Sequence, residues 1–149
     1  MISKRLPIIL SSIHLPLFVI TILSGGRYGN PFFCVDIPIS LPLVASDNTP
    51  TITVVGILGT AWWYFIGQIG WSAKQGRISR MGCGLGAFLI LLICAIDSFA
   101  MVGESFAILR APESSIVDVA IYFIAVPLLA GGIISGVLAA KGAFQSGGR

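Results

Sequence analysis

The most constraining feature of this sequence is a set of four apolar segments, each close to the length of a membrane-spanning helix. They cover residues 6–24, 51–73, 81–103 and 116–140. Because a helix rises about 1.5 Å per residue, about 20 apolar residues cross the hydrocarbon core of a bilayer. Backbone polar groups in hydrocarbon must be paired internally, and no segment sustains the alternation of a barrel strand. The sequence therefore predicts an all-α integral membrane protein, a four-helix transmembrane bundle in which residues 1–149 form one domain.

The composition agrees with a bilayer as the solvent of this chain. Hydrophobic residues make up 56% of the sequence and charged residues only 10%, against about 25% charged residues in soluble domains. So few charges cannot cover a water-facing surface, which excludes a soluble globule and a disordered chain. With 3 cysteines, a disulfide framework is excluded as well.

The positions of Lys and Arg predict that both termini face the cytoplasm. Seven of the 9 basic residues fall in segments that this topology places inside, as the positive-inside rule requires. These seven are Lys4, Arg5, Lys74, Arg77, Arg80, Lys141 and Arg149. Only Arg27 and Arg110 then lie outside. We expect an N-in, C-in protein in the cytoplasmic (inner) membrane of a bacterium.

The first apolar segment has a second interpretation. Lys4 and Arg5 before it, with Ser24 and Gly26 after it, also fit a cleaved signal peptide, although the apolar stretch is longer than the usual h-region of about 7–15 residues.

The outer loop, residues 25–50, is the only long segment between the expected helices. Within it, apolar residues from Val35 to Leu43 alternate with Asp36, Pro38 and other residues, which predicts an extended, two-faced stretch. Since proline cannot donate a ladder hydrogen bond, this stretch is expected at an edge or in a polyproline-like form that caps the outer side of the bundle. The role of Cys34 in this loop is left open.

Small residues at four-residue spacing predict how the helices pack. In lipid, helices associate through close packing of small residues, and these spacings recur in the third and fourth segments. The residues concerned are Gly82, Gly86, Gly132, Gly136 and Ala140. We expect intramolecular packing; if a partner chain exists, the Gly132, Gly136 and Ala140 stripe is the candidate face for it.

Asp97 is the most conspicuous polar residue within an expected helix. A carboxylate in a span is costly, by about 2.5–3.5 kcal/mol on insertion scales, and normally faces the bundle or a water-filled cavity. Glu104 follows seven residues later on the same face. Together they are candidates for a cation or proton site; the alternative is that Asp97 is a structural hydrogen-bonding residue.

A second group of candidates lines an expected cavity at the middle of the first two segments. It consists of His14, Trp62, Trp63 and Tyr64. These side chains fit either the wall of a lipid or quinone pocket or bulk packing opposite glycines, with His14 bonded to a hydroxyl such as that of Thr60. A single histidine excludes a three-His zinc site, no metal or cofactor motif is present, and we expect no partner for His14 in Ser/His/Asp catalysis.

Three classes of function follow; the sequence favours the first and leaves the other two as alternatives. The first is a non-catalytic accessory or scaffold subunit that packs through glycine-rich helix faces and contacts the lipid bilayer, other membrane chains or a second copy of itself. The second is a small transporter, a proton- or cation-coupled carrier that uses Asp97. The third is a lipid- or quinone-binding membrane enzyme. We find no catalytic constellation, and the positive charge is explained by topology, so we expect no nucleic-acid partner.

Overall fold

Four long helices and one helical turn make up the computed structural model, which describes residues 2–23, 36–40, 49–110 and 116–145. The long helices are α1 (Ile2–Leu23), α4 (Thr49–Lys74), α5 (Arg80–Arg110) and α6 (Ile116–Gln145). Each contains a stretch long and apolar enough to cross a membrane. The predicted all-helical class is therefore confirmed for the described residues, and α5 and α6 run past their expected ends at 103 and 140.

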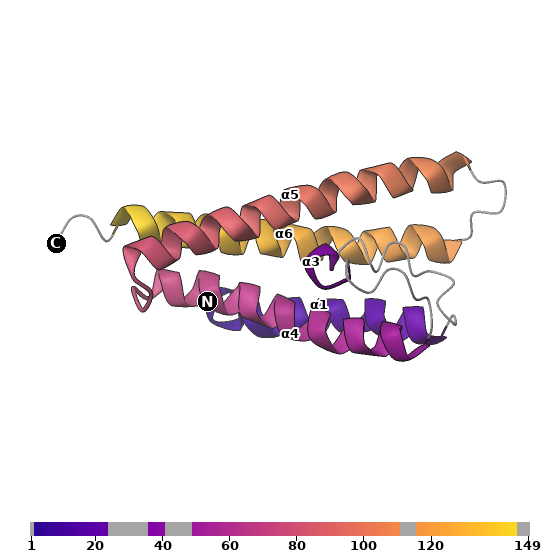
Figure 1. Ribbon diagram of the computed structural model, residues 1–149, viewed down its shortest axis with the longest axis horizontal. Helices are drawn as coiled ribbons and strands as arrows, with labels where there is room; N and C mark the ends of the chain where they lie inside the picture. The colour runs from indigo at the N-terminus through magenta and orange to yellow at the C-terminus, as the bar shows by residue number, and fades with distance from the viewer. Residues whose placement is uncertain (1, 24–35, 41–48, 111–115, 146–149) are drawn as a thin grey trace.

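The helices form two antiparallel pairs, α1 with α4 and α5 with α6 (Figure 1). Helix α6 also contacts α4 and α1, whereas α4 and α5 contact each other little. The short helix α3 (Ile37–Ser40) contacts both α4 and α5, and Figure 1 shows it between them.

Residues 36–40, in the segment predicted as an outer loop, differ from the extended stretch that the alternation predicted. Ile39 and Ser40 donate their backbone N–H groups to the Asp36 carbonyl, each at 2.8 Å, so residues 36–40 form a helical turn. This turn contacts the bundle, with Asp36 and Ser40 buried. The prediction was wrong here because a two-residue period over so short a stretch does not outweigh contacts made with other helices. Cys34 and the rest of residues 24–35 and 41–48 lie outside the described residues.

The α4–α5 connection is encoded by the local sequence. Gly76 has a φ of 67°, a left-handed conformation that glycine adopts without a Cβ clash. Its N–H donates to the Ala73 carbonyl and the N–H of Arg77 to the Ser72 carbonyl, both at 3.0 Å, which is the Schellman pattern at a helix C-terminus. Ser79 then caps α5 by accepting the Gly82 N–H at 3.2 Å.

Glycines bring the helices close together within the chain. A Cβ on Gly67 would lie 2.5 Å from the Pro7 Cα of α1. A Cβ on Gly132 would meet Cys94 of α5 and Trp63 of α4, and one on Gly136 would meet side chains of α5. The two glycines of the stripe that we considered for a partner chain are thus covered by helices of the same chain, and Ala140 is half-buried. A Cβ on Gly86 would meet Ile69 of α4, and one on Gly82 would meet Ile78 and Ser79 of the connection before α5. Ala140 packs against a small buried cluster of Ala73, Cys83, Ala87 and Ala139.

Candidate functional site: a buried polar cluster

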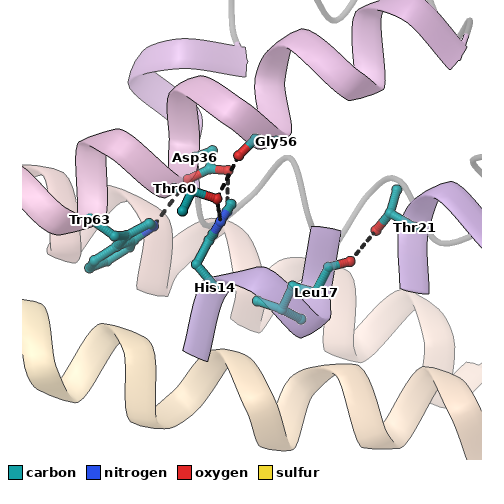
Figure 2. Close-up of polar contacts among 7 residues, drawn as sticks. All are labelled: His14, Leu17, Thr21, Asp36, Gly56, Thr60 and Trp63. Carbon is teal, nitrogen blue, oxygen red and sulfur yellow. Dashed lines mark hydrogen bonds and ion pairs between the residues drawn. The ribbon is translucent and has the colours of Figure 1, made fainter. Parts of the chain in front are cut away.

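The structure places Asp36 inside the bundle, in contact with side chains of α1 and α4. One carboxylate oxygen, Oδ2, lies 2.7 Å from His14 Nε2, and the other, Oδ1, accepts the Trp63 indole N–H at 3.0 Å. His14, Asp36 and Trp63 are all 0% exposed. Figure 2 shows the three side chains converging from separate elements. Together with Thr60 they form what we call the His14–Asp36 cluster.

The cluster lies near the midpoint of the apolar helices. His14 is ten residues from Lys4 and nine from Leu23, the ends of the apolar part of α1, so at about 1.5 Å per residue it lies close to half-way along. Trp63 occupies a similar central position in the Pro50–Lys74 stretch of α4. Asp36 therefore reaches the middle of the helices although it belongs to the segment that connects α1 to α4.

His14 is buried because it continues the buried face of α1. Leu10, Leu17 and Thr21 lie on this face at helical spacing from His14, and each is 1% exposed. The Thr21 hydroxyl donates to the Leu17 carbonyl at 2.9 Å, as Figure 2 shows. A histidine on this stripe must find polar partners inside the bundle, since unpaired buried polar groups are costly.

Gly59 provides the space for the Asp36 carboxylate against α4. A Cβ at Gly59 would overlap the Asp36 carboxyl group, whose Cγ would be only 2.7 Å away. No real Cβ makes so short a contact with a carboxyl carbon, so any larger residue has to move Asp36 or the helix. The glycine on α4 and the carboxylate before α3 thus fit each other.

Replacing Gly59 with alanine is expected to lower the free energy of unfolding by about 1–3 kcal/mol, the usual range for overpacking a core. The measurement is equilibrium unfolding of both proteins in detergent micelles. In an Asp36→Ala background the same substitution is expected to cost little, because its clash partner is gone. Equal costs in the two backgrounds would contradict the fit between Gly59 and Asp36.

Thr60 completes the cluster on the other side of the imidazole. His14 Nδ1 lies 2.9 Å from Thr60 Oγ1, and the Thr60 hydroxyl donates to the Gly56 carbonyl at 2.7 Å. With the hydroxyl proton directed at Gly56, Oγ1 can only accept, so Nδ1 must carry a proton and donate it. The expectation of a His14–hydroxyl contact is met by this pair.

This arrangement requires one further proton between His14 and Asp36. If Nδ1 is protonated, a neutral imidazole has a lone pair on Nε2 that would face the lone pairs of the carboxylate at 2.7 Å. A proton shared along the Nε2–Oδ2 line removes that repulsion, either as an imidazolium–carboxylate pair or as an imidazole with a carboxylic acid. Burial raises the pKa of the Asp36 carboxyl, while the hydrogen bonds from His14 and Trp63 oppose that rise.

The order carboxylate, imidazole, hydroxyl matches a hydrolytic triad, so our expectation that His14 lacks partners for such chemistry was wrong. Acyl transfer also needs donors for an oxyanion, and Thr60 lies inside α4, where backbone N–H groups already bond to carbonyls one turn back. The Thr60 hydroxyl likewise points along its own helix to Gly56. The cluster is chemically suited to holding and exchanging a proton.

The other residues that the sequence predicted as site candidates are not part of the His14–Asp36 cluster. Asp97 is 0% exposed on α5, and the side chain of Glu104 is outside the described residues. Tyr64 is 38% exposed and accepts a hydrogen bond from Gln68 Nε2 at 3.0 Å. Trp62 is half-buried, and its indole nitrogen has no acceptor among the described residues.

Asp36 is the residue of the cluster that sequence reasoning missed. The alternation of residues 35–43 assigned it to the polar face of an outer segment. A lone aspartate in a connecting segment carries no local signal of burial, and only the position of His14 on an apolar helix hinted that a polar partner was needed.

Comparison with known proteins gives no relative on which to base a function. No protein-family model, curated protein or solved structure matches the chain. The geometry of the site is therefore the basis for a functional assignment.

Proposed function

We propose that this protein spans a cytoplasmic membrane with both ends on the inner side. The support is the distribution of charge in the described part of the chain. The exposed basic residues Lys4, Arg5, Lys74, Arg77, Arg80 and Lys141 lie at or near helix termini that share one end of the bundle (Figure 1). This asymmetry is that of the positive-inside rule.

We further propose that the protein is a proton-coupled carrier whose proton-binding site is the His14–Asp36 cluster. The observation that carries the proposal is the buried His14–Asp36 pair near the midpoint of four apolar helices. Ionisable groups at such a depth are costly and commonly mark proton relays or substrate pathways. A pair of this kind can change its charge by one proton without changing its neighbours.

A proton suits the site better than a metal ion. Among the described residues no group of three or more His, Cys, Asp or Glu side chains could hold a metal. The two Asp36 oxygens and both ring nitrogens of His14 are already engaged with protein groups. What the cluster can exchange without losing these partners is a hydrogen-bonded proton.

The test is a pH jump on proteoliposomes adsorbed to a solid-supported membrane. A carrier that binds a proton from one side must give a transient charge displacement, whatever its other substrate is. We expect the transient for the wild type and its loss in Asp36→Asn, because the amide keeps the size of the carboxyl but cannot ionise. Gly84→Ala, at a site with nothing within 4 Å, is the matched control and should keep the transient.

Asp97→Asn in the same assay separates the two buried carboxyl groups. If the His14–Asp36 cluster is the site, this variant keeps the transient. A transient that persists in Asp36→Asn and disappears in Asp97→Asn would overturn the assignment in favour of Asp97. A wild type that gives no transient would overturn the carrier proposal itself.

An accessory subunit is the second candidate, supported by the outer face of α5. Residues at alternating spacings of four and three share this face, and all are exposed: Met81, Leu85, Phe88, Leu92, Ala95, Phe99, Val102 and Phe106. This is the spacing by which one helix packs along another. Native purification followed by mass spectrometry is expected to show a stoichiometric partner chain if this function is correct, and only protein and lipid if it is wrong.

A further inference from the structure

The Thr60 hydroxyl can act as either donor or acceptor toward the imidazole. In the arrangement described above it accepts the His14 Nδ1–H and donates to the Gly56 carbonyl. Asp36 Oδ1 accepts a hydrogen bond from the Trp63 indole N–H. This is the proton-loaded state, in which the His14–Asp36 pair is neutral.

Loss of one proton forces a different pattern. The Asp36 carboxylate must still face a donor at 2.7 Å, so the remaining imidazole proton has to lie on Nε2. Nδ1 then presents a lone pair to Thr60. The hydroxyl can satisfy it by turning from the Gly56 carbonyl toward Nδ1, since that carbonyl is in the interior of α4 and has a backbone donor in the helix ladder.

We propose that Thr60 is a positioning residue that sets the proton affinity of the His14–Asp36 cluster by reversing its hydroxyl. In the loaded state Nδ1–H and Nε2–H (or Oδ2–H) are both present. In the unloaded state Nε2–H alone remains, one proton has passed to water, and the charge of the pair falls from zero to minus one. The inference rests on the proposed proton-binding function and names the residue that tunes it.

Thr60 favours the loaded state. It makes two hydrogen bonds there, to Nδ1 and to the Gly56 carbonyl, and one in the unloaded state. The expected net difference is one hydrogen bond, which corresponds to a change in proton affinity of up to roughly tenfold.

Other titratable groups on the helices around the cluster can also affect its proton affinity. In the described part of the bundle these are Cys83, Cys94 and Asp97 on α5, which are buried, and Tyr122 on α6, which is partly buried. Tyr64 of α4 is exposed, and the described Lys and Arg side chains lie near one end of the helices. The substitutions below leave all of these groups in place, so they cancel in the comparison of variants.

Because the chain has 1 histidine, ¹⁵N-labelled histidine gives NMR signals from His14 alone. The full chain in lipid nanodiscs is titrated, and the ¹⁵N shifts report which ring nitrogen is protonated. We expect the wild type to carry a proton on Nδ1 below the midpoint and only on Nε2 above it. Thr60→Val should lower the midpoint by about one pH unit, while Thr60→Ser, which keeps the hydroxyl, should titrate like the wild type.

The outcomes separate this inference from the function on which it rests. An Nδ1–H tautomer above the midpoint of the wild type, or an unchanged midpoint in Thr60→Val, would overturn the role of Thr60 while leaving the carrier intact. The tautomer measurement needs no variant, so it decides the question even if Thr60→Val does not fold. A wild-type His14 that does not titrate at all, together with no pH-jump transient, would remove the proton site itself.

Discussion

Asp36→Ala is expected to lower the free energy of unfolding by about 3–5 kcal/mol, the cost of removing one partner of a buried pair. The carboxylate accepts from Trp63 Nε1 and contacts His14 Nε2, and both groups are 0% exposed. Alanine leaves the two nitrogens buried without that acceptor. Equilibrium unfolding in mixed detergent micelles, followed by circular dichroism, measures the loss.

A double variant tests whether the cost comes from the orphaned partners. Replacing a whole buried ion pair by apolar residues is often nearly neutral, so His14→Leu combined with Asp36→Leu should recover much of the stability that Asp36→Ala loses. A loss below about 1 kcal/mol in Asp36→Ala would show that the carboxylate does not hold His14 and Trp63 as described.

Gly67→Ala is expected to have the second large effect, because the added methyl group would meet backbone and not a flexible side chain. Its Cβ would lie 2.5 Å from Pro7 Cα and 2.7 Å from Pro7 N. Neither atom can move without shifting α1, so we expect a loss of about 1–3 kcal/mol or more and a wider separation of α1 and α4. Unfolding in micelles gives the stability, and distance measurements between spin labels on the two helices give the separation.

The matched control is Gly84→Ala on α5, where nothing lies within 4 Å of the new Cβ. Alanine is a better helix former than glycine by about 0.5–1 kcal/mol, so this variant should be as stable as the wild type or more stable. A Gly67→Ala protein that behaves like Gly84→Ala would contradict the close approach of α1 to α4.

The sequence by itself determined the four helices. Their apolar length is a local property, and so are the stops between them: Gly76 ends α4 in a left-handed conformation, and Ser79 caps α5. Packing of helices through small residues also followed from composition along each helix. The sequence did not predict which glycine contacts which helix, since that depends on how each helix is rotated about its axis.

The sequence indicated only some residues of the candidate site. His14 stood out as a polar residue on an apolar helix, and Thr60 was a plausible hydroxyl partner because it occupies a similar depth in the next helix. Asp97 stood out for the same reason and is buried as expected. These residues lie within helices, where spacing along the chain converts directly into depth.

The burial of Asp36 and the role of Gly59 in leaving room for its carboxylate depend on the tertiary structure alone. Asp36 is 22 residues from His14 and 27 from Trp63 along the chain, and no periodic pattern connects the three. Its burial follows from complementary groups on α1 and α4: a ring nitrogen, an indole N–H and a glycine that leaves room for the carboxylate. Such a fit exists only once the helices have their register and rotation, which is why the sequence placed this residue at the surface and the fold placed it at the centre.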